Sequence, residues 1–360
     1  MSLRRPVPAA CAVGLSALAL SACGELSEDS GLGAAEEATV CMVAEGEGFE
    51  DLSFHQSAHE GLEQAARDTG VSTRESVVGS DAESDPALRS MVQSGCDLTI
   101  ANGQPLSQVA LEVAAENPQA AFATVDDSAV EGLGNVKPLS FDSGTAAFLA
   151  GYLAAGTTET GTVAAFGGED IPRVRLVLDG FAEGVEHWNE LKDDDVELLG
   201  WDRQEQEGTM LGSFKDVEGA REVTEGFLDN GADIVLPAAG GASEGTAQAV
   251  AATGEGTDQA LFIWIDTDGY DVLPEAQRSH QLTSVLKDLT GPVESLVRDL
   301  EDGELDLDPY VGTLENGGVG IADHHDQQER VGPELAAEVA GLRQQIIDGE
   351  LEIESQEDAG

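Results

Sequence analysis

The chain has 360 residues and a formal net charge of −53, with 70 aspartate and glutamate residues against 17 lysine and arginine residues. The acids are spread along the sequence rather than gathered in one tail. Binding to nucleic acid is disfavoured, because no basic patch is present to neutralise phosphates. Charge of one sign repels itself unless salt screens it, which favours an acidic, halophilic surface adapted to a saline habitat. The alternative is an acidic surface for binding cations or basic partners.

Residues 1–22 are predicted to be a lipoprotein signal peptide. Two arginines precede the apolar run 9–20, which is too short to span a bilayer permanently. Leu-Ser-Ala-Cys at 20–23 resembles a lipobox, which implies cleavage before Cys23 and lipidation of its thiol. The alternative is an ordinary secretory signal. Residues 23–38 are small and acidic and are expected to be a tether. The expected location is therefore the extracytoplasmic face of the cell membrane, through a lipid anchor.

From residue 39 onwards, apolar strands alternate with helices. Strands are predicted at 39–44, 73–79, 96–101, 121–125, 136–140, 162–165, 196–201, 234–238, 261–265 and 282–286. Helices are predicted at 53–69, 84–94, 106–116, 144–157, 175–190, 217–230, 245–253, 292–302 and 333–349. Most strands are continuous apolar runs, typical of parallel strands buried on both faces. The alternation predicts a doubly wound α/β fold.

Two similar successions of elements, 39–140 and 162–265, predict two Rossmann-like lobes. Loops at the carboxyl ends of parallel strands face a crevice, which is where such folds bind ligands. The candidate loops are 45–55, 102–105, 126–127, 167–172, 212–216, 238–245 and 266–269.

The loop that follows the first strand contains an unusual aromatic residue, Phe54. Asp51 or Ser53 can cap the helix that begins here, and the free N–H groups at its start favour polar or anionic ligand atoms. Phe54 either packs back on the helix as a hydrophobic staple or forms a stacking platform for a flat ligand.

Charged residues follow several other strands. Asp266 and Asp126 occupy positions from which a carboxylate can accept hydrogen bonds from the two hydroxyls of a ribose; the alternative is a solvated surface charge. Lys287 ends a strand and can pair with Asp266 or Glu45, or with a surface acid. The segment 240–245 has the order of neither a P-loop nor a dinucleotide site, so its glycines are expected to let backbone approach a ligand.

The remaining reactive side chains do not form a recognised catalytic pattern. Cys41 and Cys96 begin predicted strands and are either disulfide-bonded or buried free thiols. His324 and His325 lie between two aspartates, but adjacent histidines converge poorly on one ion, so no metal site is expected. Neither a Ser–His–Asp arrangement nor a Cys–His pair is visible, and we predict no catalytic residue, no cofactor and no enzyme activity.

A series of motifs carries a family resemblance: DLSFHQSAHEG (51–61), LAGYLAA (149–155), GGEDIPRVR (167–175), DGFAEGV (179–185), GSFKD (212–216), GADIVLPAAGG (231–241), WIDTDG (264–269), LTSVLKD (282–288) and GGVGI (317–321). In this order they resemble the basic membrane protein family of bacterial lipoproteins. These are substrate-binding components of ABC importers and include purine nucleoside receptors. The resemblance extends from about Val40 to the C-terminal helix.

The resemblance implies a type I periplasmic-binding-protein fold, with two Rossmann-like lobes of parallel sheets joined by a hinge. Residues 39–141 and 267–312 are assigned to the first lobe, and residues 142–266 and 313–352 to the second. The expected ligand is a nucleoside, with a purine nucleoside favoured. Phe54 and Phe214 are implied to sandwich its base, and Asp266 with Lys287 to hold its ribose. The resemblance also places the Gly240 backbone and Asp126 at the ligand.

Two positions depart from the family pattern. His55 stands where the family usually has asparagine, and Glu45 stands where it usually has aspartate. An amide offers both a donor and an acceptor, whereas a neutral imidazole offers one of each in a different geometry. The substitution therefore bears on base preference and introduces sensitivity to pH near the histidine pKa.

The implied partners are an ABC permease and ATPase, with the protein acting as a monomer tethered to the membrane through lipid on Cys23. Capture by hinge closure is the expected mechanism. The alternative is a ligand-sensing lipoprotein that presents a nucleoside, or another small polar solute, to a membrane sensor.

Overall fold

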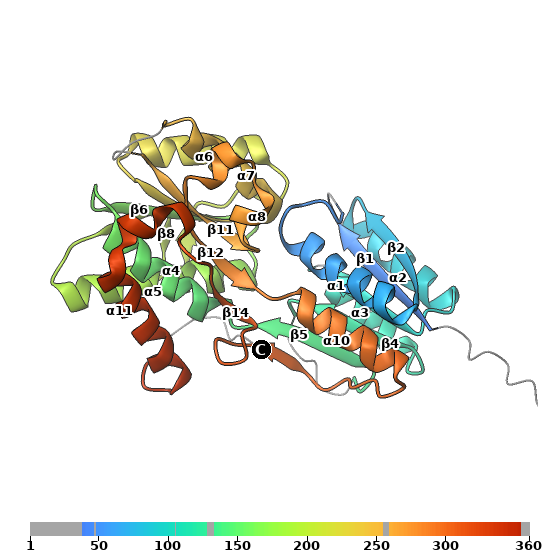
Figure 1. The fold of residues 1–360 in the computed structure, drawn as a ribbon. Coiled ribbons are helices and arrows are strands. Elements are labelled where there is room, and N and C mark those ends of the chain that lie inside the picture. The colour runs from blue at the N-terminus through green and yellow to red at the C-terminus, as the bar shows by residue number, and fades with distance from the viewer. Residues whose placement is uncertain (1–37, 47, 105, 128–132, 255–258, 354–360) are drawn as a thin grey trace, which may run out of the picture. The chain divides into compact units, whose positions relative to one another are not determined.

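The computed structural model describes residues 38–46, 48–104, 106–127, 133–254 and 259–353. The predicted signal peptide, Cys23 and nearly all of the acidic tether lie outside the described residues. Two six-stranded sheets organise the described chain (Figure 1).

The first sheet has the strand order β13-β5-β4-β3-β1-β2. Its strands are β1 (Thr39–Glu45), β2 (Ser72–Val78), β3 (Leu98–Asn102), β4 (Ala121–Val125), β5 (Val136–Phe141) and β13 (Tyr310–Gly312). All neighbouring strands are parallel. The associated helices are α1 (Phe54–Thr69), α2 (Asp81–Gln93), α3 (Leu106–Glu116) and α10 (Thr290–Glu301). Helix α10 lies beside α1, where Thr290 Oγ1 donates a hydrogen bond to the Ser57 carbonyl at 2.9 Å.

The second sheet has the order β14-β12-β11-β10-β6-β7. Its strands are β6 (Thr162–Gly167), β7 (Glu197–Leu199), β10 (Ile234–Ala238), β11 (Leu261–Asp266), β12 (Gln281–Lys287) and β14 (Val319–Ile321). Its helices are α4 (Ser143–Thr157), α5 (Pro172–Lys192), α6 (Val217–Asp229), α7 (Glu244–Ala251), α8 (Gly269–Val272), α9 (Glu275–Arg278) and α11 (Gln328–Ile347). A small hairpin pairs β8 (Trp201–Asp202) with β9 (Glu207–Gly208), and η1 (Gly240–Ser243) and η2 (His325–Gln327) are 3-10 turns.

The chain passes between the two sheets after β5, after β12 and again between β13 and β14. Backbone hydrogen bonds join these crossing segments: Asp142 N–H donates to the Gly312 carbonyl at 2.8 Å, and Asp288 N–H donates to the Gly318 carbonyl at 2.9 Å. A Cβ atom on Gly318 would collide with Gly312 Cα. Glycine is therefore required where two crossing segments touch.

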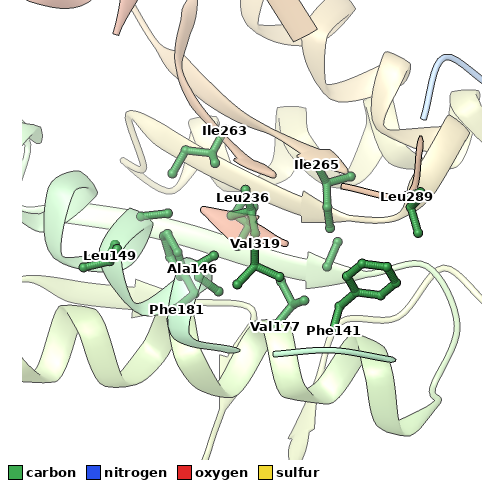
Figure 2. Packing of buried hydrophobic residues seen from close by; sticks show 14 of the residues in the cluster. Phe141, Ala146, Leu149, Val177, Phe181, Leu236, Ile263, Ile265, Leu289 and Val319 are labelled. Carbon is green, nitrogen blue, oxygen red and sulfur yellow. The ribbon is translucent and has the colours of Figure 1, made fainter. Parts of the chain in front are cut away.

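The core of the second sheet is built around helix α4, which is apolar on all sides and almost completely buried. Phe181, Leu149, Leu236 and Ile263 belong to the hydrophobic cluster in Figure 2. Glycines allow α4 and α5 to pack closely, because a Cβ on Gly151 would collide with the Phe181 carbonyl. Burial of each large side chain in this cluster contributes about 2–3 kcal/mol.

The predicted α/β class is confirmed, with several corrections. Residues 267–312 were assigned to the first lobe, but β12 pairs with β11 in the second sheet, so the chain leaves that sheet only after Lys287. The sheets are not wholly parallel, since β14 runs antiparallel to β12. The predicted strand 196–201 is divided at Gly200, which has a φ of +87°. Strands β13 and β14 were not predicted.

The two cysteines form a disulfide between β1 and the turn before β3. Strands β1 and β3 are neighbours, and the Cα atoms of Cys41 and Cys96 are 5.9 Å apart. Of the two alternatives for these cysteines, the disulfide is therefore confirmed and the pair of buried free thiols is wrong.

His325, one of the two adjacent histidines, contacts an aromatic ring and a carboxylate. His325 stacks on Tyr270 with ring centroids 4.0 Å apart, and its Nε2 lies 2.7 Å from Asp268 Oδ2. Among the described residues, no group of three potential ligands could hold a metal ion.

Candidate functional site

Loops at the carboxyl ends of strands from both sheets line a cavity of about 250 Å³. All eight residues predicted from the sequence lie in its lining: Glu45, Phe54, His55, Asp126, Phe214, Gly240, Asp266 and Lys287. The structure therefore brings the whole predicted set to one place, and the role of each residue in ligand binding stays a prediction.

Asp51 fixes the start of helix α1 and the residues that follow. Its Oδ1 accepts hydrogen bonds from the backbone N–H groups of Ser53 (3.1 Å) and Gln56 (2.9 Å), and its Oδ2 accepts from His55 N–H (3.0 Å). Ser53 does not cap the helix. Its hydroxyl instead donates to Asp266 Oδ2 at 2.5 Å, which links this loop to the end of β11.

Phe54 and Phe214 enter the cavity from segments associated with different sheets. Phe54 is half-buried at the start of α1, and a Cβ on Gly103 would lie 3.3 Å from its ring. Phe214 lies in the segment between β9 and α6, and its ring occupies the space that a side chain at Gly168 would need. Gly240, with a φ of +53°, lies near the same ring. Glycine at these positions lets the aromatic rings lie directly against backbone.

A buried lysine lies between two carboxylates at the carboxyl ends of strands. Lys287 Nζ donates to Asp126 Oδ2 at 2.9 Å and lies 3.6 Å from Asp266 Oδ1. The three side chains are 9%, 13% and 7% exposed, respectively. Lys287 Nζ also lies 5.3 Å from the centroid of the Phe54 ring. Lys287 therefore pairs with Asp266, one of the partners predicted from the sequence, and also with Asp126, which was not predicted as its partner.

Two members of this trio, Asp266 and Lys287, have shifted pKa values. Burial raises the pKa of Asp266, against the opposing effects of Lys287 and the Ser53 hydroxyl. Burial also acts against the charged form of Lys287, but Asp126 and Asp266 outweigh it and raise the pKa of the ammonium group. Asp126 and Asp266 adopt left-handed backbone conformations, with φ values of +64° and +67°. Strained backbone of this kind concentrates at functional sites.

Glu45 is held by the first turn of helix α3. Its Oε1 accepts a hydrogen bond from the Leu106 N–H at 3.0 Å. A carboxylate at this position is stabilised by the positive end of the helix dipole. Glu45 therefore lines the cavity while the protein holds its carboxylate in place.

His55 is the departure from the family pattern, and its environment favours the neutral ring. Burial lowers the pKa of His55, although Asp51 and the Asn102 side chain oppose this effect; Lys215 lowers it further. The Asn102 amide nitrogen donates to the His55 carbonyl at 3.3 Å. His55 Nδ1 is buried and has no hydrogen-bond partner among the described residues.

Several lining residues were not singled out from the sequence: Gln104, Glu169, Arg173 and Lys215. Three of them lie in predicted strand-end loops, and Arg173 lies in the first turn of α5, directly after such a loop. Arg173 is only 9% exposed. In a chain so poor in cations, an arginine beside a strand-end loop was a signal that could have identified it.

No helix in the described part of the chain combines the length and apolarity needed to cross a membrane. Two α/β lobes with a ligand-sized cavity at their strand ends are typical of proteins that bind a small ligand. The family model for the ABC transporter substrate-binding protein PnrA-like family, Bmp, matches residues 38–357. The chain belongs to this family, whose members are substrate-binding proteins rather than enzymes.

Similar proteins span nearly the whole chain. The CD4+ T-cell-stimulating antigen of Listeria innocua is 26% identical over 357 residues, covering 94% of this chain and 95% of that protein. The ABC transporter nucleoside-binding protein BmpA of Lactococcus lactis is 24% identical over 370 residues, covering 98% of this chain and 100% of that protein.

Solved structures support the fold. An ABC transporter solute-binding protein from Aeropyrum pernix has a TM-score of 0.79 at 24% identity, covering 89% of this chain and 94% of that chain. One from Conexibacter woesei has a TM-score of 0.66 at 22% identity, covering 89% and 100%. The fold is the type I periplasmic-binding-protein fold expected from the sequence.

Proposed function

We propose that this protein captures a purine nucleoside in the cavity and delivers it to an ABC permease and ATPase. One observation carries the proposal: two phenylalanines, from segments of different sheets, line the same small cavity as the Asp126–Lys287–Asp266 trio. Aromatic rings bind the faces of a base, and carboxylates with an ammonium group bind hydroxyls. A nucleoside carries both of these chemical groups.

The aromatic pair, Asp266 and Lys287 each have a task in this proposal. Stacking on Phe54 and Phe214 contributes about 1–3 kcal/mol per base and tolerates different bases. Asp266 accepts hydrogen bonds from the ribose hydroxyls, and Lys287 donates a hydrogen bond to a hydroxyl oxygen while it holds Asp266 in place. The ribose contacts select a nucleoside over a free base.

The charge of the lining favours a nucleoside over a nucleotide. Five carboxylate side chains line the cavity: Glu45, Asp51, Asp126, Glu169 and Asp266. The cations in the lining are Arg173, Lys215 and Lys287. Because the acids outnumber the cations, a phosphate group would add repulsion inside a confined space.

Closure of the two lobes around the ligand is the proposed mechanism of capture. Contacts between the loop before α1 and the second sheet support it. Thr267 Oγ1 donates to the Leu52 carbonyl at 3.3 Å, and Ser53 donates to Asp266. The crossing segments at Asp142, Asp288 and Gly318 would act as the hinge, because the chain passes between the two sheets there.

Isothermal titration tests the ligand. Adenosine, guanosine or inosine should bind, whereas the free bases and the nucleoside 5′-monophosphates should bind far more weakly. Absence of binding by every nucleoside would refute the proposal.

Phe54→Ala should weaken nucleoside binding by about 1–3 kcal/mol, because one stacking face is lost. Phe49→Ala is a matched control, since Phe49 stacks on His59 with centroids 4.2 Å apart and does not line the cavity. Equal affinities of the two variants would return Phe54 to the role of a helix staple.

The proposal includes a monomer anchored to the extracytoplasmic face of the membrane through lipid on Cys23, with an acidic surface suited to a saline habitat. The lipobox-like sequence and the charge of −53 support these points. Mass spectrometry of the N-terminal peptide from membranes tests the anchor: a mature N-terminus other than a lipidated Cys23 would refute it.

A further inference from the structure

The cavity contains a histidine whose two ring nitrogens have different environments. His55 Nδ1 is buried and makes no hydrogen bond with any described residue. Nε2 also has no hydrogen-bond partner in the described chain, but this atom is not fully buried. It is therefore accessible from the cavity that His55 lines. Nε2 can therefore contact a ligand in the cavity, whereas Nδ1 can interact only with the protein.

Asn102, at the end of β3, contacts His55 and is completely buried. Its amide nitrogen points to the His55 carbonyl at 3.3 Å and to Met42 Sδ at 3.8 Å. This orientation leaves Asn102 Oδ1 as a second buried polar atom without a partner among the described residues. The Asn102 side chain acts on the His55 ring as a hydrogen-bonding group. Because an amide oxygen can only accept a hydrogen bond, the state of His55 that complements Asn102 Oδ1 carries its proton on Nδ1.

The Phe54 and His55 rings are nearly perpendicular, with an interplanar angle of 84° and centroids 5.2 Å apart. A base that lies flat on Phe54 cannot also lie flat on His55. The contact left for His55 is with the edge of the base.

We propose that His55 Nε2 acts as a hydrogen-bond acceptor for an N–H group on the edge of the bound base, with Asn102 as the residue that fixes this tautomer. The inference rests on the proposed nucleoside function and narrows it. The cavity selects bases that present an N–H donor, such as inosine through N1–H or adenosine through its amino group. An asparagine at position 55 would accept this donor and also offer one of its own, and so would select less strictly.

Purine riboside provides the discriminating probe, because its base has no N–H group. Titrations at neutral pH should show inosine binding about tenfold more tightly than purine riboside, since one buried acceptor is left unpaired with the latter. In His55→Phe the ratio between the two ligands should fall towards one. His59→Gln, on the same helix and outside the cavity lining, should keep the wild-type ratio.

The outcomes separate the inference from the function on which it rests. If inosine and purine riboside bind the wild-type protein equally well, the inference is overturned while the nucleoside function stands. If neither binds, the proposed function fails and the inference fails with it.

Long-range ¹H–¹⁵N NMR of the full folded body gives a readout that does not depend on ligand. We expect His55 to carry its proton on Nδ1, and Asn102→Leu to remove this preference. A proton found on Nε2 in the wild-type protein would overturn the assignment.

Discussion

Replacement of Lys287 with methionine tests the physical account of the site most directly. Unit charges attract by about 6 kcal/mol at the Lys287–Asp126 distance of 2.9 Å and by about 5 kcal/mol at the Lys287–Asp266 distance of 3.6 Å, for an effective dielectric constant of about 20. Desolvation of the three groups and repulsion between the carboxylates offset most of this attraction. Removal of the cation leaves two buried acids uncompensated, a change that typically costs about 3–5 kcal/mol. We expect a loss near 3 kcal/mol, because the cavity admits water.

The loss should depend on pH. The pKa of Asp266 is already raised in the folded protein, and it rises further without Lys287. A folded-state carboxyl pKa above its unfolded value, about 3.9, means that the folded protein binds the proton more tightly. Stability is then gained as pH falls through the raised pKa and lost as pH rises through it. The variant should therefore be closer to wild type at about pH 5 than at about pH 7.5.

Urea unfolding without ligand, at constant salt and at both pH values, measures this effect. Lys192→Met is the matched control, because Lys192 is 32% exposed and pairs with Glu338 at 2.8 Å; it should lose under about 1 kcal/mol. The reasoning is refuted if Lys287→Met loses no more stability than Lys192→Met. It is also refuted if the loss is greater in acid.

Further predictions concern the disulfide, the surface charge and His55. Reduction of Cys41–Cys96, which are 55 residues apart, should lower the free energy of unfolding by about 4 kcal/mol in urea titrations with a reductant, and an unchanged midpoint would contradict this. With a net charge of −53, the melting temperature measured by calorimetry should rise with sodium chloride concentration, whereas a flat response would argue against surface repulsion. Burial lowers the folded-state pKa of His55, so the unfolded chain takes up the proton first as pH falls below about 6.5. Stability should therefore decline from about pH 6.5 towards the folded pKa more steeply in the wild type than in His55→Gln, and equal slopes in urea titrations would exclude this role.

The sequence predicted the strands and the crevice because both depend on local pattern. Buried strands such as β3 and β10 are short apolar runs, and the rule that ligands bind at strand ends pointed to the loops that line the cavity. Strands β13 and β14 have three residues each and exist through pairing with β5 and β12, so no local pattern marks them.

Side-chain partners were less predictable than positions. Ser53 looked like a helix cap, but an acceptor 213 residues away in sequence takes its hydroxyl, and Asp51 caps the helix in its place. Lys287 meets Asp126 across 161 residues. The lobe boundary was misplaced for the same reason, since only tertiary pairing assigns β12 to the second sheet.

The charges of this protein fall into two groups with different physical roles. The many surface acids interact through water, where salt screens them. Lys215 and Lys287 are among only four lysines in the sequence, and both line the cavity with Arg173. Lys287 is almost buried between its two acids, where salt screens poorly. Because the proposed ligand is neutral and Lys287 pairs with Asp126 and Asp266 inside the protein, the affinity for the ligand should change little over the salt range that governs stability. Salt should therefore change the stability of this protein more than its ligand recognition.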